Sequence, residues 1–121
     1  MIERTSKTTI DATAETMDAL RVRLGDVPVV DEEEQLNALS IDTYWRAKAL
    51  AAAGRPALAD AVVHPRDAAE VARVLAVATE LGVPVTPRAG GSGSQGGAVP
   101  DRGGIVLDTS ALDRIVELDE I

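Results

Sequence analysis

The sequence contains no cysteine and almost no aromatic residues. Without cysteine the chain forms no disulfide, no zinc–thiolate site and no cysteine nucleophile. With one tyrosine, one tryptophan and no phenylalanine among 121 residues, the core must be built from aliphatic side chains. A chain of this length corresponds to one domain or part of one, and it is just large enough to bury a working core.

Long apolar runs and a basic surface are also missing. No stretch approaches the run of about 18 apolar residues that a membrane-spanning helix needs, and residues 1–7 lack the apolar segment of a secretory signal. The net charge of −8 argues against nucleic acid as the main partner, because binding to phosphates needs positive charge. We therefore expect a cytoplasmic protein without a nucleic-acid partner or a membrane span.

The acidic run at residues 31–34 is most simply a solvated loop or the start of a helix. A calcium site would need oxygen ligands spaced along a loop around a turn glycine, and the run lacks this pattern. We therefore expect no metal site.

Residues 1–57 are expected to form a helical and irregular extension. The spacing of apolar residues predicts a helix over residues 13–24, which Gly25 ends. Residues 26–42 are acidic, contain a proline and are expected to be irregular. A second, alanine-rich helix is expected over residues 43–53.

Residues 58–121 have the pattern of a small α/β sheet. A helix is expected from Asp67, the N-cap of a capping box in which Glu70 reaches back, to Gly82 as its C-terminal cap. Its buried stripe is predicted to consist of Val71, Val74, Leu75, Ala78 and Leu81. The expected strands lie at residues 61–64, 83–87 and 105–108, followed by a last extended stretch at residues 115–118.

These elements predict an α/β fold with a small, mostly parallel βαββ sheet and covering helices. Parallel sheets need cover on both faces. The pattern supplies one clear covering helix, and the N-terminal helices are the candidates to cover the second face. The predicted sheet is therefore incomplete, and we expect the natural protein to continue past Ile121 or another chain to dock here.

A glycine-rich loop at residues 88–104 separates two of the expected strands and holds seven of the ten glycines. Glycine adopts positive φ angles and lets another group approach the backbone, and successive N–H groups can converge on an anion. Arg88 leads into the loop, and Ser92, Ser94 and Gln95 add side-chain donors. This chemistry suits a pyrophosphate, although a plain surface turn remains the alternative.

Two common phosphate motifs do not explain this loop. Residues 91–96 satisfy the G-x-G-x-x-G spacing, but a dinucleotide fingerprint requires a helix after the last glycine, and here a strand follows. A P-loop requires Gly-Lys followed by Ser or Thr, and the loop contains no lysine.

Residues 87–98 resemble the pyrophosphate-binding segment of the FAD-linked oxidases related to vanillyl-alcohol oxidase, the glycolate oxidase D-subunit and D-lactate dehydrogenase. In that family the segment reads roughly Pro-Arg-Gly-x-Gly-Thr-x-x-x-Gly-Gly-Ala. The flanking family elements occur in the same order, so the resemblance covers residues 58–121. Their counterparts are residues 61–65, 67–71, 82–85, 105–108 and 115–119.

The resemblance implies the first half of a PCMH-type FAD-binding domain over residues 58–121, with FAD as cofactor. Ala89 and Ser92 depart from the family's glycine and threonine, and both are small. Some relatives carry a flavin-linked histidine where Ser92 stands, so we expect non-covalent FAD. The residues implied in binding are Pro87, Arg88, Ala89, Gly90, Gly91, Ser92, Gly93, Ser94, Gln95 and Gly97.

The resemblance also implies a flavin-dependent oxidoreductase acting on a small alcohol or 2-hydroxy acid such as glycolate or D-lactate. The substrate domain is absent from this sequence, so the chain alone is expected to be inactive and to meet a small-molecule substrate only through that missing domain. His64 is expected to pack or cap, and Tyr44 and Trp45 to fill or cover the core. Two alternatives are a non-catalytic module that pairs with another chain or a second copy through its unfinished sheet, and a site for another nucleotide phosphate.

Overall fold

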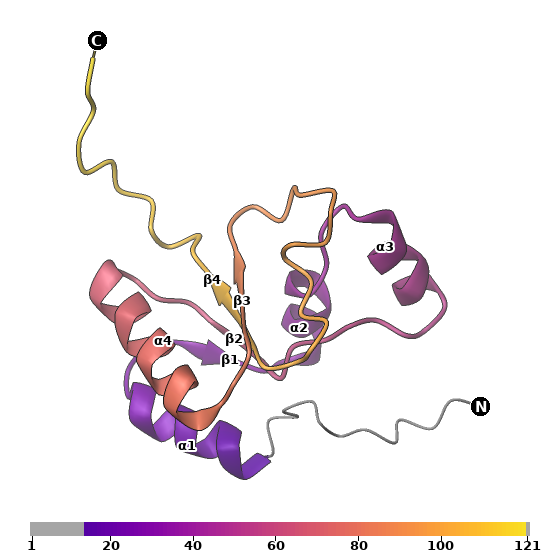
Figure 1. The fold of residues 1–121 in the computed structure, drawn as a ribbon, viewed down its shortest axis with the longest axis horizontal. Coiled ribbons are helices and arrows are strands. Elements are labelled where there is room, and N and C mark those ends of the chain that lie inside the picture. Colours follow the sequence, from indigo (N-terminus) through magenta and orange to yellow (C-terminus); the bar gives the residue numbers. More distant parts are fainter. Residues whose placement is uncertain (1–13, 121) are drawn as a thin grey trace.

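Residues 14–120, which the computed structural model describes, form one four-stranded sheet flanked by helices (Figure 1). Its strands are β1 (Val29–Val30), β2 (Ala61–Val63), β3 (Val85–Arg88) and β4 (Ile105–Asp108). They lie in the order β1-β2-β4-β3, where β4 is parallel to both of its neighbours and β1 is antiparallel to β2. The predicted small, mostly parallel α/β sheet is confirmed.

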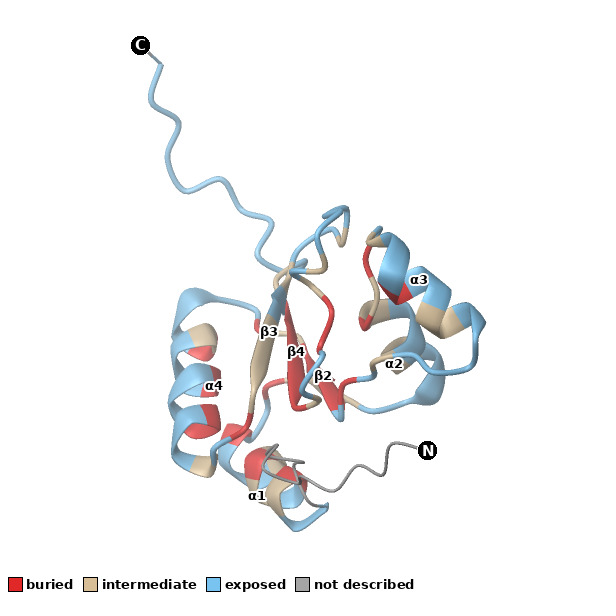
Figure 2. Cartoon of the chain, turned by 45° about the vertical axis from the view of Figure 1, so that its right-hand side comes forward, coloured by how far each residue is buried: buried red, intermediate tan, exposed pale blue. Residues whose placement is uncertain are grey.

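Helices lie on both faces of this sheet (Figures 1 and 2). They are α1 (Ala14–Leu24), α2 (Glu33–Leu39), α3 (Trp45–Ala52) and α4 (Ala68–Leu81). α1 and α4 pack on each other and share the larger core cluster with the sheet, whereas α2 packs on the opposite face. The helices expected over residues 13–24 and 43–53 correspond to α1 and α3, although residue 13 itself lies outside the described residues.

The central strands are aliphatic on both of their faces. Side chains alternate along a strand, so Ala61 and Val63 join the α1–α4 side of the core while Val62 faces Leu36 and Leu39 from the region of α2. All residues of β4 are buried, as expected for a parallel strand that is covered on both sides. The second face is therefore covered by a helix from the N-terminal third, α2, which lies in a segment expected to be irregular.

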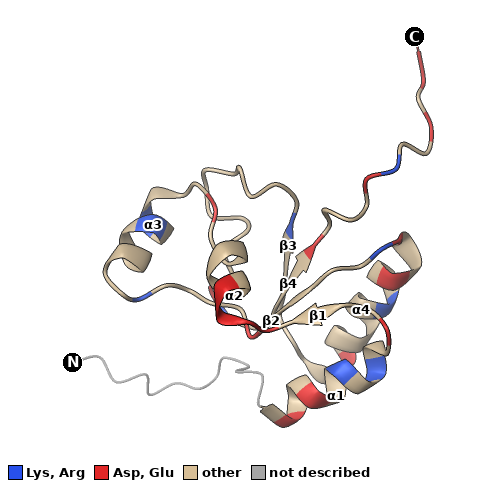
Figure 3. Ribbon diagram, turned by 180° about the vertical axis from the view of Figure 1, so that it is seen from behind, with Lys and Arg blue, Asp and Glu red and all other residues tan. Residues whose placement is uncertain are grey.

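The expectation that residues 26–42 are irregular was wrong, because this segment contains β1 and α2. A strand of two residues shows no periodicity, and β1 forms through its antiparallel pairing with β2. The acidic run begins α2, with Glu33 and Glu34 in the first turn (Figure 3). Negative charge near the N-terminus of a helix interacts favourably with the helix dipole.

The buried face of α4 also differs from the prediction. Leu75, expected in the apolar stripe, is 43% exposed, and Val77 is buried in its place. The buried positions include Val74, Ala78 and the charged Glu70. The helix is therefore rotated relative to the predicted stripe, with Glu70 turned toward the protein.

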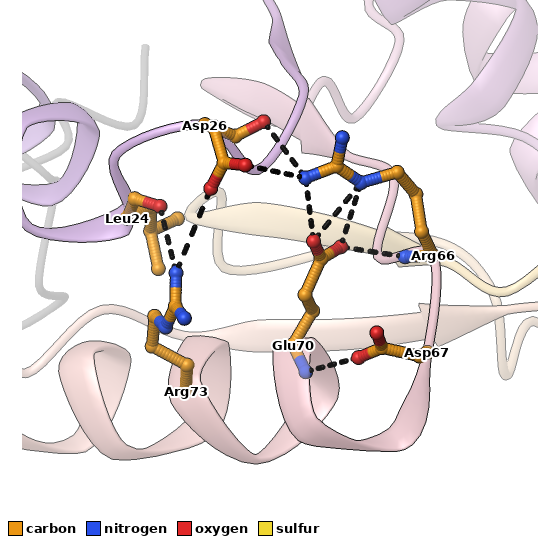
Figure 4. Close-up of polar contacts among 6 residues, drawn as sticks. All are labelled: Leu24, Asp26, Arg66, Asp67, Glu70 and Arg73. Carbon is orange, nitrogen blue, oxygen red and sulfur yellow. Dashed lines mark hydrogen bonds and ion pairs between the residues drawn. The ribbon is translucent and has the colours of Figure 1, made fainter.

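Glu70 is turned inward by a network around Arg66 (Figure 4). Asp67 Oδ1 accepts a hydrogen bond from Glu70 N at 2.8 Å, which confirms Asp67 as the N-cap. The Glu70 carboxylate reaches Arg66 instead of the Asp67 backbone, accepting from Arg66 N at 2.7 Å and Arg66 Nη2 at 2.6 Å. Arg66 also contacts Asp26 at 3.1 Å, so the network ties the turn after α1 to the start of α4.

We expect Glu70→Gln to lower the melting temperature at neutral pH by a few degrees. The Arg66 side chain and backbone N–H hold the pKa of Glu70 below its ordinary value. A lowered pKa in the folded state means that the ionised carboxylate stabilises the fold above its unfolded pKa, and that this stabilisation is lost as the pH falls through the folded value. Melting curves from pH 7 toward pH 3 should therefore converge for the two proteins, and equal melting temperatures at pH 7 would contradict this role.

The last extended stretch does not join the sheet. Residues 115–118 pair with no strand of the described chain and leave the sheet at the end of the ribbon (Figure 1). Ile115 is 80% exposed, Val116 86% and Leu118 73%. Three large apolar side chains of this short stretch therefore face solvent.

Candidate functional site

The glycine-rich loop, residues 88–104, leaves the carboxyl end of β3 and returns to the amino end of β4 (Figure 1). Because β2, β4 and β3 are parallel, their carboxyl ends meet at one edge of the sheet, where the first part of the loop begins. The edge carries His64 after β2, Arg88 at the end of β3 and Asp108 at the end of β4. Ligands of open α/β sheets bind outside the carboxyl ends of the strands, so the loop lies where a ligand is expected.

Residues 41–44, between α2 and α3, hold the loop from one side. Arg88 Nη1 donates a hydrogen bond to the carbonyl oxygen of Ile41 at 2.5 Å. Thr43 donates twice to the carbonyl oxygen of Gly93, from its backbone N at 3.0 Å and from Oγ1 at 2.8 Å. These contacts give the loop a defined path and make it more than a plain surface turn.

Two glycines of the loop have a left-handed backbone conformation and a side chain packed where their own Cβ would lie. Gly91 has a φ of +66°, and a Cβ there would overlap the guanidinium of Arg88. Gly96 has a φ of +83°, and a Cβ there would lie 2.8 Å from the ring of Tyr44. The positive charge of Arg88 therefore rests against bare backbone at Gly91, which is the combination that an anion site needs.

A buried carboxylate lies beneath the same loop. Asp42 is 4% exposed, and its Oδ1 accepts a hydrogen bond from Tyr44 N at 2.9 Å. Its Oδ2 is buried and has no hydrogen-bond partner among residues 14–120. An ideal Cβ on Gly93 would lie 3.7 Å from Oδ2, so this oxygen lies next to the loop.

The ends of the three parallel strands are joined by polar contacts. His64 Nδ1 lies 3.2 Å from Asp108 Oδ2, and Asp108 Oδ1 accepts from Ser110 N at 3.0 Å. Thr109 donates to the carbonyl oxygen of Arg88 from its backbone N at 2.8 Å and from Oγ1 at 3.1 Å. His64 thus pairs with a neighbouring strand end, an arrangement consistent with the expected structural role.

A cavity of about 300 Å³ lies between α3 and the loop. Tyr44, Arg46, Gln95, Gly96 and Asp101 are among the residues that line it. Tyr44 is half-buried and covers Gly96, but Trp45 is 72% exposed and contacts Tyr44 edge-to-face at a ring separation of 6.1 Å. Trp45 therefore does not fill the core, because an aliphatic interior closes without it.

The predicted binding residues lie together along the first part of the loop. Arg88 and Gly91 are half-buried, and the remaining eight, which are Pro87, Ala89, Gly90, Ser92, Gly93, Ser94, Gln95 and Gly97, are exposed. Their individual roles in binding stay a prediction. Ile41, Asp42 and Thr43 were missed, because their neighbours in the loop lie 47 to 51 positions away and they carry no local motif.

Comparison with protein families identifies this kind of site. A family model described as an FAD binding domain matches residues 59–121, more than half of the chain. The chain belongs to this family of FAD-binding domains. FAD is therefore the cofactor of the domain, and Arg88, the positive-φ glycine beside it and the exposed loop donors are groups that fit a pyrophosphate.

Curated relatives of this FAD-binding domain are FAD-linked oxidoreductases. The chain is 41% identical over 61 residues to glycolate oxidase subunit GlcD of Bacillus subtilis, covering 50% of this chain and 13% of that protein. It is 44% identical over 54 residues to D-lactate dehydrogenase of Archaeoglobus fulgidus, covering 45% and 12%. A mitochondrial D-lactate dehydrogenase [cytochrome] of Kluyveromyces lactis is 33% identical over 115 residues, covering 88% and 19%. The chain therefore spans less than a fifth of these relatives.

Solved structures share the fold of this domain. An alkyldihydroxyacetonephosphate synthase matches with a TM-score of 0.74 and 20% identity, over 98% of this chain and 23% of that one. p-Cresol methylhydroxylase matches with a TM-score of 0.64 and 22% identity, over 87% of this chain and 20% of that one.

None of the helices within residues 14–120 has the length and apolar character needed to cross a membrane.

Proposed function

We propose that the loop grips the pyrophosphate of non-covalently bound FAD in an oxidoreductase that acts on a small alcohol or 2-hydroxy acid. The observation that carries this proposal is the Arg88 guanidinium, held against the bare backbone of Gly91 at the carboxyl edge of the sheet. Arg88 supplies positive charge, and the backbone N–H groups of a positive-φ glycine turn can converge on phosphate oxygens.

Exposed side-chain donors surround this charge. Ser92, Ser94 and Gln95 are exposed, and the only side-chain hydrogen bond found for them within residues 14–120 is a long one, 3.4 Å from Gln95 Nε2 to Ser94 Oγ. They can therefore donate to a ligand with little rearrangement. Neither histidine nor cysteine is present in residues 88–104, which supports non-covalent binding by this segment.

The substrate class rests on the named relatives. Glycolate oxidase, D-lactate dehydrogenase and a probable D-2-hydroxyglutarate dehydrogenase are all named for 2-hydroxy acids. In such chemistry the protein positions and tunes the cofactor, and further groups must orient the substrate. We propose that those groups lie in the rest of the whole protein, and that residues 14–120 contribute to binding the pyrophosphate of FAD.

Retention of flavin is the direct test. The purified chain is mixed with FAD, desalted and scanned in the visible range, and a retained flavin band is the expected result. ADP added in excess should displace part of the flavin, because it presents the same pyrophosphate. A chain that binds ATP or ADP but does not retain FAD after desalting would contradict the assignment of FAD as the ligand and would favour another nucleotide.

The exposed apolar tail favours one second candidate, a module that pairs with another chain. Ile115, Val116 and Leu118 would be buried by such a partner, and burying large apolar side chains is favourable. A chain that retains no FAD and elutes as a dimer in size-exclusion chromatography would support this candidate over the flavin site.

A further inference from the structure

The carboxylate of Asp42 is buried beneath the loop with one oxygen satisfied and the other unpaired. Oδ1 accepts from Tyr44 N, while Oδ2 has no hydrogen-bond partner within residues 14–120. Burying a polar atom without a partner is costly, and a charged group costs more. Such an atom in a native protein calls for an explanation, and a partner that arrives with a ligand is one.

The surroundings of Asp42 connect it to the loop. Its neighbours in sequence, Ile41 and Thr43, already bind Arg88 and Gly93. The unpaired Oδ2 lies next to Gly93, in the middle of the exposed stretch that contains the loop donors. The donors on either side of Gly93 are therefore candidates to meet Oδ2.

We propose that Asp42 is a positioning residue of the FAD site, whose Oδ2 receives an O–H hydrogen bond when FAD is bound. This inference rests on the proposed function. The hydroxyl comes from Ser92 or Ser94, which flank Gly93 and turn inward as the loop closes on the pyrophosphate, or from the sugar portion of FAD itself. In both cases the missing partner of the carboxylate arrives with the cofactor.

Whether neutralising Asp42 raises or lowers the affinity for FAD separates this role from simple charge repulsion. A carboxylate near a pyrophosphate repels it, so a residue acting only through its charge would weaken FAD binding, and its neutralisation would strengthen binding. A residue that accepts a hydrogen bond in the loaded site has the opposite effect, and its neutralisation weakens binding. In the cofactor-free protein, removal of an unpaired buried charge is stabilising.

Asp42→Asn is the informative substitution, because asparagine keeps the shape of the side chain and the oxygen that accepts from Tyr44 N. We expect the melting temperature of the FAD-free variant to rise by about 4 °C. We expect its affinity for FAD, measured by titration of flavin fluorescence, to fall by about tenfold or more, the usual effect of losing a hydrogen bond to a charged group. Asp18→Asn, an equal charge change at an exposed position of α1, is the matched control and should change neither value.

The source of the hydroxyl is resolved by a Ser92→Ala/Ser94→Ala double variant. If the serines supply it, the double variant loses affinity as Asp42→Asn does, and combining all three changes adds nothing further. If a sugar hydroxyl supplies it, the two losses add.

Two outcomes would overturn the role of Asp42. One is an Asp42→Asn variant that binds FAD as tightly as the wild type or more tightly, and the other is an FAD-free variant that melts at a lower temperature. A wild-type chain that binds no FAD would instead defeat the proposed function, and with it this inference. The two failures are therefore distinguished by the wild-type titration.

Discussion

Gly104→Ala should destabilise the domain more than any other single methyl group added to a glycine. Gly104 is buried at the start of β4, has a φ of +72°, and a Cβ there would overlap the carbonyl oxygen of Pro84. That oxygen belongs to the backbone and accepts a hydrogen bond from Ile105 N at 2.9 Å, so it cannot move away without loosening the pairing of β3 with β4. Gly104 N also donates to Asp60 Oδ2 at 2.7 Å, which fixes the turn from the other side.

We expect Gly104→Ala to lower the free energy of unfolding by about 3 kcal/mol or more, a large part of the stability of a small domain. Urea denaturation followed by circular dichroism measures it. Gly54→Ala is the matched control, since Gly54 has a φ of +74° but nothing within 4 Å of its added Cβ. In the control, the left-handed backbone conformation alone should lower the free energy of unfolding by only about 1 kcal/mol. Equal losses for the two variants would show that the overlap with Pro84 is relieved at no cost.

Gly91→Val is expected to remove most of the FAD affinity and leave the domain folded. The added side chain would occupy the space of the Arg88 guanidinium, and it would place a branched group where the phosphate approaches the backbone. Arg88 is flexible, so it can move aside, and the fold survives while the positive charge is displaced. We expect affinity to fall by about tenfold to a hundredfold, the range for losing a charge-assisted hydrogen bond.

The control for this substitution is Gly25→Val. Gly25 ends α1, has a φ of +61° and has open space around its added Cβ, so the variant reproduces the backbone penalty away from the loop. Flavin fluorescence titrations should show unchanged affinity for Gly25→Val. A folded Gly91→Val protein with unchanged affinity would remove the loop from the FAD site.

The sequence by itself determined the features whose information is local. The N-cap at Asp67, the C-terminal cap at Gly82 and the strands at β2 and β4 follow from caps and apolar runs in adjacent residues. The membership in the FAD-binding family follows from a contiguous stretch that needs no knowledge of the fold. Such patterns are readable because neighbouring residues in the chain are also neighbours in space.

The tertiary structure alone decided the features that join distant parts of the chain. β1 is too short to have a periodicity and exists because β2 pairs with it. The rotation of α4 depends on Arg66, which binds Glu70 and is itself held by Asp26 in the turn after α1. The support beneath the loop comes from residues 41–44, which precede the loop by more than 40 positions. No local pattern encodes these contacts, because their energy appears only when the folded sheet brings the segments together.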